Sequence, residues 1–424
     1  MHDLRMIRDQ LPALREGMRR RGMLDVLEHI LERSDHLEKE RRSLITAADE
    51  RKQKRNMVSQ EVGRRKRRGE DCEALVEESR GLGDEIANLD ARLNEVQASL
   101  DGLLLEIPNI TLPDVPDGGA ENNRVVRNWG SPRPTDGVRP HWEVAEQHGV
   151  IDFVRGTKIS GSGFVAYRGA GARLVRTLLQ YLLDLHTREH GYEEVWVPVV
   201  VNRASMIGTT QLPKFEEDMY GLREEGMYLI PTAEVPVTNL YRDETLEVTD
   251  LPRAFVAYSP CFRREAGSAG KDTRGVLRMH EFDKVELVRY AVPERSSGEL
   301  ELLTGHAETV LQRLGLPYRV VLLASGDTGF GSTKTFDLEV WAPGVGKWLE
   351  VSSCSSFGDF QARRMGIRYR PGHGEKPRLI HTLNGSGVAF PRLIAAIFEH
   401  YQQSDGSIAI PEALRPAFGA DRIG

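Results

Sequence analysis

The chain has 424 residues, which is too long for one typical domain, and its hydrophobic fraction of 40% is sufficient for two or three domains with cores of their own. The net charge is −6, yet residues 51–68 carry nine lysines and arginines against one acid, Glu61. That segment therefore has a charge of +8 and the remainder −14, which indicates that a polyanion binds at one place.

Cysteine usage and hydropathy exclude several classes of protein. The three cysteines, Cys72, Cys261 and Cys354, are odd in number and widely spaced, so they predict neither a disulfide framework nor a cysteine-based zinc site. The N-terminal stretch MHDLRMIRDQ lacks the apolar core of a secretory signal. The longest apolar run, VWVPVVV, is too short to span a bilayer. We therefore expect a cytoplasmic protein that has no membrane partner.

The first predicted elements form a long helical hairpin. Apolar residues from Leu75 to Leu103 recur in alternating steps of three and four, which is typical of a coiled-coil seam. The preceding limb, from Leu27 to Val62, follows the same rhythm with a more polar seam. Gly69-Glu70-Asp71 offers the turn, directly after RRKRR. The pattern predicts an antiparallel coiled coil with limbs of roughly 60 Å and a basic tip near residues 64–71.

Two functions fit such an arm. A dimerisation coiled coil with a solvated charged face is the simpler one. Charge gathered near one end instead favours an arm that holds a nucleic acid through its phosphates, and thus by shape. The candidate contact residues are Arg51, Lys52, Lys54, Arg55, Arg64, Arg65, Lys66, Arg67 and Arg68.

The composition changes after the arm. Residues 106–140 are rich in Pro, Gly and Asn, which predicts a linker between an arm domain at 1–105 and a second domain at 141–424. In the second domain apolar helices alternate with segments such as YEEVWVPVVVN and LIPTAEVPV, which we interpret as strands. Hairpin-type connections predict an α+β fold with a mostly antiparallel sheet flanked by helices. The chain has neither a GxGxxG nor a GxxxxGK[ST] motif, so a Rossmann or P-loop nucleotide site is unsupported.

The stretch CFRREAGSAGKDTRGVLRMHEFDKVEL, residues 261–287, predicts a hairpin with functional side chains. Alternation would place Arg263 and Glu265 on one face of its first strand, and Arg278, Phe282 and Glu286 on one face of its second.

A third arginine comes from the C-terminal region, where Pro391 suits a first helical turn and so places Arg392 there too. A cation at a helix N-terminus opposes the macrodipole, and an anion bound between them would resolve the conflict. Together with Arg263 and Arg278 this predicts a polyphosphate site, with Phe282 stacked on a base.

These residues carry a resemblance to class II aminoacyl-tRNA synthetases. GYEEVWVPVVVN resembles motif 1, the stretch at 261–287 resembles motif 2, and LNGSGVAFPR resembles motif 3. Within that class GTTQLPKFEEDMY, PTAE, SSCSSFGDFQARRM and HTLNGSG are similar to the seryl-tRNA synthetase family, in its bacterial, zinc-independent form. The resemblance covers essentially the whole chain, including the N-terminal arm.

The resemblance implies roles for individual residues. The counterparts of Arg263 and Arg392 are catalytic through the phosphates, and those of Glu350 and Ser353 position Mg²⁺. The implied ATP site consists of Arg263, Arg264, Glu265, Arg278, Phe282, Glu350, Val351, Ser352, Ser353 and Arg392. The implied serine site consists of Thr232, Ala233, Glu234, Arg263, Glu286, Asn384 and Ser386. The residues at 350 and 353 are three apart, which breaks strand alternation and predicts a bulge or a strand end.

Within each of the pairs Thr232 and Glu234, and Asn384 and Ser386, the two residues lie two apart and can share a strand face. The sequence departs from the family pattern at Thr210, at Ser356-Phe357 and at Pro391. The first two departures lie close to the implied pocket, and Pro391 fits a helix start.

The resemblance implies an enzyme that joins serine to ATP as seryl adenylate and then transfers the seryl group to tRNA(Ser), and also to tRNA(Sec). It further implies a homodimer formed through motif 1. Two alternatives remain, a ligase that charges a carrier protein and a catalytically silent tRNA-binding protein. The basic arm speaks against the first, and retention of the three arginines and of Glu265 and Glu286 against the second.

Overall fold

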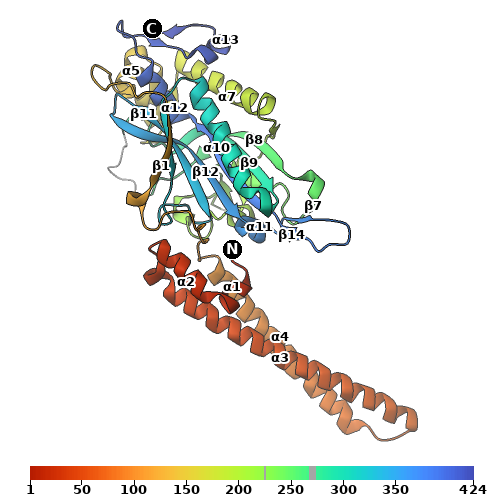
Figure 1. The fold of residues 1–424 in the computed structure, drawn as a ribbon. Coiled ribbons are helices and arrows are strands. Elements are labelled where there is room, and N and C mark those ends of the chain that lie inside the picture. The colour runs from red at the N-terminus through yellow and green to blue at the C-terminus, as the bar shows by residue number, and fades with distance from the viewer. Residues whose placement is uncertain (224–225, 267–273) are drawn as a thin grey trace. The chain divides into compact units, whose positions relative to one another are not determined.

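A computed structural model describes residues 1–223, 226–266 and 274–424, and the chain divides into two compact units (Figure 1). The N-terminal unit is Met1–Pro108 and the C-terminal unit is Asn109–Gly424. The central part of the predicted motif 2 loop, residues 267–273, lies outside the described residues.

The N-terminal unit is built on an antiparallel helical hairpin, as the heptad pattern predicts. Its helices are α1 (Leu4–Asp9), α2 (Leu11–Arg20), α3 (Leu24–Arg68) and α4 (Glu73–Leu104). The predicted seam of α4 is buried at Leu82, Ile86, Val96 and Leu100. In α3 the buried position is Glu38, where the heptad predicted Leu37, and its carboxylate accepts a hydrogen bond of 2.7 Å from Arg41. The polar seam of this limb is thus shifted by one residue at this place.

The hairpin turns where the sequence predicts it. Gly69 ends α3 in the left-handed conformation, with φ of +70°, and its N–H bonds back to the carbonyls of Arg65 and Lys66. Residues 64–68, called the basic tip below, are all exposed.

The basic residues farther from the turn make cross-helix ion pairs. The donor–acceptor distances are 2.5 Å for Arg51–Glu85, 3.2 Å for Lys52–Asp90 and 2.8 Å for Lys54–Glu78. Three of the nine candidate phosphate contacts therefore already bridge α3 to α4.

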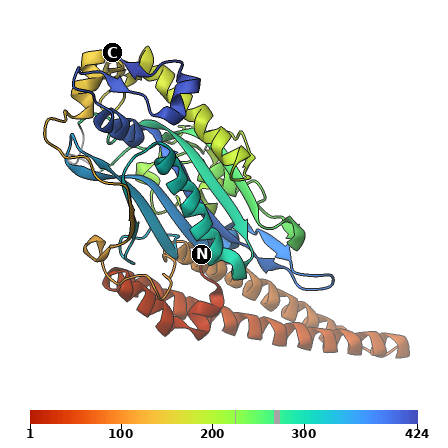
Figure 2. The ribbon, with the colours of Figure 1, turned by 45° about the horizontal axis from the view of Figure 1, so that its top comes forward.

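The C-terminal unit contains an eight-stranded sheet that is antiparallel except where β4 pairs with β8 (Figure 2). Its strands, in spatial order, are β1 (Arg124–Trp129), β10 (Tyr318–Leu322), β11 (Lys334–Ala342), β12 (Lys347–Gly358), β15 (His381–Ala389), β9 (Glu281–Ala291), β8 (Arg253–Phe262) and β4 (Glu193–Glu194). The predicted α+β fold with a mostly antiparallel sheet is confirmed.

Helices cover the sheet and shorter elements complete the unit. Helix α10 (Ser296–Arg313) lies across β12 and β15, while α12 (Phe390–His400) contacts β11 and α7 (Ala170–Arg188) contacts β8. The other helices are α5 (His141–His148), α6 (Phe153–Ser160), α8 (Arg203–Gly208), α9 (Glu234–Thr238), α11 (Phe360–Met365) and α13 (Arg415–Phe418). The remaining strands are β2 (Ile151–Asp152), β3 (Ala166–Tyr167), β5 (Val200–Asn202), β6 (Met227–Leu229), β7 (Thr245–Glu247), β13 (Arg368–Arg370), β14 (Arg378–Leu379), β16 (Ile408–Ala409) and β17 (Arg422–Ile423).

Three segments differ from the predicted elements. YEEVWVPVVVN forms two short strands, β4 and β5, in different sheets, with Pro198 in the irregular stretch between them. LIPTAEVPV forms the end of β6, a turn and helix α9, because Pro231 lacks the N–H that would continue the strand ladder. Within the predicted linker 106–140, β1 pairs with β10, and Arg127 binds Glu308 of α10 at 2.8 Å. Part of the predicted linker, Arg124–Trp129, is therefore a strand of the sheet.

In the described part of the chain, no helix is both long and apolar enough to cross a membrane.

Substitutions at two glycines of the arm, Gly63 and Gly69, test whether the turn requires a left-handed backbone conformation. A Cβ at either Gly63 or Gly69 would meet no atom within 4 Å, so only backbone conformation distinguishes them. Gly69→Ala should destabilise the arm by about 1 kcal/mol, because alanine disfavours positive φ. Gly63→Ala, inside α3, should stabilise it by up to about 1 kcal/mol. Hydrogen exchange of arm amides in the full chain measures both, and equal effects of the two changes would contradict the turn geometry.

Candidate functional site

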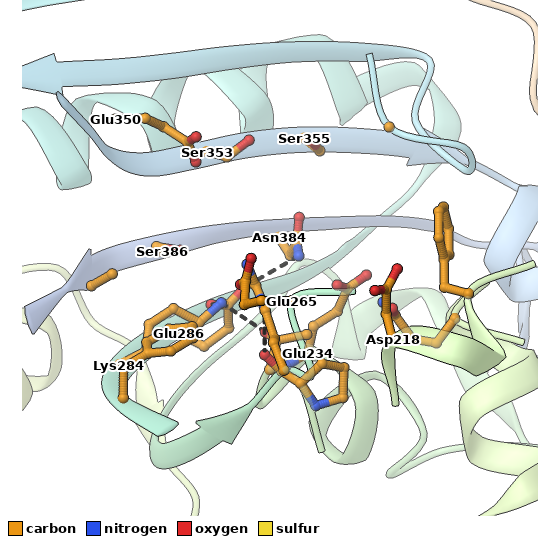
Figure 3. Close-up of a pocket in the computed structure, with 18 of the residues that line it drawn as sticks. Asp218, Glu234, Glu265, Lys284, Glu286, Glu350, Ser353, Ser355, Asn384 and Ser386 are labelled. Carbon is orange, nitrogen blue, oxygen red and sulfur yellow. Dashed lines mark hydrogen bonds and ion pairs between the residues drawn. The ribbon is translucent and has the colours of Figure 1, made fainter. Parts of the chain in front are cut away.

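A cavity of about 550 Å³ opens in the C-terminal unit beside the middle of the sheet. It is lined by polar side chains of β9, β12 and β15, by the segment that follows β8 and by the first turn of α12. In Figure 3 the side chains of Glu350 and Ser353 on β12, and of Asn384 on β15, face the same space as Glu265, Glu286 and Glu234.

Three arginines gather at this cavity. Arg263 lies with its guanidinium carbon 5.2 Å from the centroid of the Phe282 ring. The guanidinium of Arg278 binds the carboxylate of Glu265 at 2.5 Å. Arg392 donates to the backbone oxygens of Leu277 at 3.1 Å and Glu350 at 2.8 Å. All three side chains line the cavity, as the sequence predicts.

The predicted strand positions of two of these arginines are wrong. Strand β8 ends at Phe262, which pairs with Glu281, so Arg263 and Glu265 lie beyond the ladder. Glu265 has φ of +52°, which no strand residue adopts, and Arg278 precedes β9. Tertiary contacts, such as that of Arg278 with Glu265, bring these side chains together where simple alternation would not.

The first turn of α12 contains Pro391 and Arg392, as predicted. The guanidinium folds back onto two carbonyl oxygens, which offsets the unfavourable interaction of a cation with the positive end of the helix. An anion at this place stays a prediction.

Buried carboxylates and small polar groups form another part of the cavity wall. Lys284 forms a buried ion pair with Glu286 and donates to the hydroxyl of Thr232 at 2.7 Å. Asn384 donates to the other oxygen of Glu286 at 3.1 Å. Glu234 begins α9, so the prediction that it shares a strand face with Thr232 is wrong, although both line the cavity.

Lys284 was not predicted, although strand alternation places it on the same face as Phe282 and Glu286.

Burial changes the acid–base properties of Glu234. Desolvation, and next the nearby Glu286 carboxylate, raise the pKa of Glu234 to about 7, while a hydrogen bond from Gln361 acts in the opposite direction. A cationic ligand placed against Glu234 would favour the ionised form. The wall is therefore suited to an ammonium group.

Known proteins resemble the chain over its full length. Residues 215–401 match the family described as tRNA synthetase class II core domain (G, H, P, S and T), and residues 1–111 match the seryl-tRNA synthetase N-terminal domain. A serine–tRNA ligase of Gemmatimonas aurantiaca is 63% identical over 420 residues, which cover 99% of both chains. One from Geobacillus kaustophilus is 53% identical and also covers 99% of both.

The chain belongs to the seryl-tRNA synthetase family.

Solved structures agree with this assignment. A seryl-tRNA synthetase from Pyrococcus horikoshii, crystallised with ATP, superimposes with a TM-score of 0.95 at 36% identity and covers 100% of this chain and 99% of its own. A cytoplasmic serine–tRNA ligase from Naegleria fowleri, in complex with AMP, gives a TM-score of 0.90 at 28% identity and covers 98% of its own chain. The resemblance seen in the sequence is thereby confirmed.

Most residues that the synthetase resemblance implied meet in the cavity. Thirteen of the sixteen line it, namely Thr232, Glu234, Arg263, Glu265, Arg278, Phe282, Glu286, Glu350, Val351, Ser353, Asn384, Ser386 and Arg392. Ala233, Arg264 and Ser352 are not among the lining residues. The Arg264 side chain donates to the carbonyl oxygen of Glu217, and the Ser352 hydroxyl to that of Ser386.

The predicted bulge lies between Glu350 and Ser353 on β12. On β11, Leu338 pairs with Ser352 and Glu339 with Glu350, so Val351 has no partner across the ladder. Asp337 lies opposite Ser353, and one of its carboxylate oxygens is buried without a hydrogen-bond partner in the described structure. Burial, followed by the charge of Glu350, raises the pKa of Asp337 well above its usual range.

This donor set fits Mg²⁺, which prefers oxygen ligands and keeps much of its water and phosphate shell. A cation at Glu350 and Ser353 would also relieve the crowding of negative charge with Asp337. Among the described residues, no group of three His, Cys, Asp or Glu side chains is arranged to hold a metal ion by itself.

The first two sequence departures are neighbours in the fold. Thr210 has φ of +69° and lines the cavity. A Cβ at Gly331 would lie 2.9 Å from the Thr210 hydroxyl and 3.2 Å from the Phe357 ring. Both departures thus lie beside the same glycine, Gly331, and together they shape this part of the cavity wall.

The buried ion pair of this wall has a testable energetic signature. The side chains of Lys284 and Glu286 are only 7% and 1% exposed. Lys284→Met should lower the free energy of unfolding of the C-terminal unit by about 3–5 kcal/mol, because a buried carboxylate loses its cation. Lys54→Met, which breaks the exposed pair with Glu78, should cost less than about 1 kcal/mol.

Urea unfolding of the full chain, followed by fluorescence, measures this difference. The double variant Lys284→Met with Glu286→Gln should regain much of the loss. A Lys284→Met protein as stable as the Lys54→Met control would show that the pair does not stabilise the pocket wall.

Proposed function

We propose that the chain activates L-serine with ATP to form seryl adenylate and transfers the seryl group to tRNA(Ser). The observation that carries this proposal is one cavity whose walls hold three arginines and, beside them, two buried carboxylates with small hydroxyl and amide groups. The first set suits a polyphosphate and the second a small amino acid with a polar side chain.

Serine recognition would use the carboxylate wall. Lys284 forms an ion pair with Glu286, so a substrate ammonium would favour the ionised form of Glu234 and pair with it. Thr232, Asn384 and Ser386 would bind the serine hydroxyl. Alanine would leave these groups unpaired at considerable cost, which favours serine over it.

ATP would use the arginines and the aromatic ring. Arg263 would bind the α-phosphate and the substrate carboxylate. Phe282 would stack on the adenine ring, and the Glu265 carboxylate would accept a hydrogen bond from the adenine amino group. Arg278 and Arg392 would hold the outer phosphates. Because Arg278 binds Glu265 and Arg392 binds backbone oxygens, ATP must replace both sets of contacts. Each guanidinium is thereby kept close to where the phosphates would lie.

Catalysis of the first step would come from positioning and charge neutralisation. The serine carboxylate attacks the α-phosphorus, the bond to the β-phosphate oxygen breaks, and pyrophosphate leaves. A magnesium ion held by Glu350 and Ser353 would supply further charge neutralisation at the phosphates. Arg263 orients the attacking carboxylate, and Arg278 and Arg392 stabilise the charge on the departing pyrophosphate. The step needs no protein nucleophile or general base.

The second step would use the helical hairpin as a tRNA clamp. The terminal adenosine hydroxyl of tRNA attacks the seryl carbonyl carbon, and AMP leaves. The exposed basic tip would contact phosphates of the long variable arm of tRNA(Ser), and of tRNA(Sec) as a second substrate. A ligase that charges a carrier protein would have no use for this arm.

A homodimer formed through motif 1, in the cytoplasm, completes the proposal. Trp196, in motif 1, is 75% exposed, and Val154 and Ile159 of α6 are 79% and 77% exposed. Large apolar side chains of this kind are what a second copy would cover.

Amino-acid-dependent ATP–pyrophosphate exchange tests the first step without tRNA. Serine should support exchange, while threonine, alanine and glycine should support at least about a hundredfold less at equal concentration. Arg392→Ala should reduce the serine rate by at least about a hundredfold, because a charge-stabilising donor is lost.

Arg422→Ala serves as the matched control, since that exposed arginine makes surface ion pairs with Asp405 and Asp421. It should retain the full rate. No exchange with any of the four amino acids, in protein that still binds tRNA, would overturn the proposed enzyme.

The arm is tested by reversing its charge. Changing Arg64, Arg65, Lys66, Arg67 and Arg68 to Glu should weaken tRNA(Ser) binding by at least about a hundredfold and flatten its salt dependence, because phosphate contacts are lost. Serine-dependent pyrophosphate exchange should stay unchanged. Reversal of the exposed Arg368 and Arg370 in the C-terminal unit is the control. Equal losses in both variants, measured by filter binding between 50 and 200 mM salt, would exclude a specific role of the tip.

A further inference from the structure

A chain of two buried polar side chains lies behind the Glu234 carboxylate. Thr382 on β15 donates its hydroxyl hydrogen to Gln361 Oε1 at 2.7 Å. Gln361 on α11 donates from Nε2 to Glu234 Oε1, also at 2.7 Å. Thr382 and Gln361 are both 0% exposed, so water does not compete for these bonds.

The direction of the chain follows from hydrogen-bond chemistry. An ionised carboxylate only accepts, so the group facing Glu234 must be the amide N–H and not the amide oxygen. The amide oxygen then faces Thr382, whose hydroxyl can donate to it. If Thr382 lost its hydroxyl, the orientation of the Gln361 amide would no longer be fixed at both ends.

Neither Thr382 nor Gln361 lines the cavity, so they would act on a ligand through Glu234 alone. They come from two elements of the sequence that contact each other, β15 and α11. Thr382 shares its strand face with Asn384 and Ser386, which do line the cavity. The polar face of β15 therefore extends past the cavity wall to a layer that supports it.

We propose that Thr382 and Gln361 are positioning residues that hold Glu234 as an oriented, hydrogen-bond-accepting anion for the ammonium group of the amino acid. This inference rests on the proposed function of the cavity. The amide fixes the rotation of the carboxylate about its terminal bond, so the carboxylate is oriented before the substrate arrives.

The charges around Glu234 explain why such support is needed. Glu286 repels its negative charge, while Lys284 and Arg263 attract it. Burial dominates and brings the pKa of Glu234 to about 7, and the Gln361 N–H is the strongest of the interactions that lower it. Because an ammonium ligand needs the ionised form, serine affinity should rise as the pH rises through about 7. Loss of the amide bond should raise the pKa of Glu234 and move this rise to higher pH.

Four variants separate positioning from folding. Gln361→Met removes the donor at similar volume, and Thr382→Val removes the hydroxyl at similar shape. Thr382→Ser keeps the hydroxyl and should behave like the unchanged protein within about threefold. The matched control is Thr304→Val, because Thr304 is also 0% exposed and donates its hydroxyl hydrogen to the backbone of α10, at Leu300.

The experiment measures KM for serine and for ATP by tRNA-free pyrophosphate exchange between pH 6 and 9, using the full chain. Gln361→Met and Thr382→Val should raise KM for serine at pH 7 by about tenfold or more, as expected for a lost bond to a charged group. KM for ATP should change less than about twofold, and the KM of serine should fall again at higher pH. If Gln361→Met does not fold, the comparison of Thr382→Val with Thr382→Ser decides.

A second readout does not need catalysis. Carboxyl ¹³C NMR of Glu-labelled protein follows the titration of Glu234, which should move to higher pH in Gln361→Met and Thr382→Val. Thr304→Val should leave the titration and both KM values unchanged. An unmoved titration in Gln361→Met and Thr382→Val, or KM values for serine and ATP that rise together in them, would overturn the inference. Unchanged protein that shows no serine-dependent exchange would instead overturn the proposed function, whatever the titration of Glu234 does.

Discussion

The antiparallel pairing of β12, β15 and β9 is the constraint on which the site depends. Cys354 pairs with Gly385, and Ser386 with Glu286, so the residues on either side of Gly385 point to the cavity. A Cβ at Gly385 would clash with Leu303 of α10 and lie 2.9 Å from Cys354 Sγ. Glycine therefore lets α10 pack closely on one face of the sheet, while Asn384 and Ser386 are presented on the other. The same alternation exposes Phe282, Lys284 and Glu286 to the cavity.

Charge compensation follows from this arrangement. Strand β9 supplies Glu286 and helix α9 supplies Glu234 to one buried wall, where Lys284 forms an ion pair with Glu286. The remaining negative charge is stabilised by the amide of Gln361 and is suited to a cationic ligand. Of the three arginines that line the cavity, Arg278 pairs with Glu265 and Arg392 with Glu350, while Arg263 lies over the Phe282 ring.

Local sequence rules predicted the parts of this site that lie within regular structure. Alternation placed Asn384 and Ser386 correctly, and the spacing of Glu350 and Ser353 predicted the bulge at Val351. Alternation failed for Arg263 and Glu265 because the ladder of β8 ends one residue earlier.

The remaining features depend on tertiary contacts that no local pattern contains. The hydrogen bonds from Thr382 through Gln361 to Glu234 join three elements, with sequence separations of 21 and 127 residues. The overall fold and the helical hairpin could be predicted because heptads and hairpin connections repeat over long segments. Lys284 could have been found by alternation alone, since it lies between two predicted residues of the same face.

A crystal structure with serine and a non-hydrolysable α,β-methylene analogue of ATP would show directly how the cavity binds both substrates. We expect the serine ammonium within hydrogen-bond distance of Glu234 and Glu286. We also expect the serine carboxylate beside Arg263 and the outer phosphates against Arg278 and Arg392. Serine bound with its ammonium away from both carboxylates, or a triphosphate that avoids these arginines, would contradict this mode of binding.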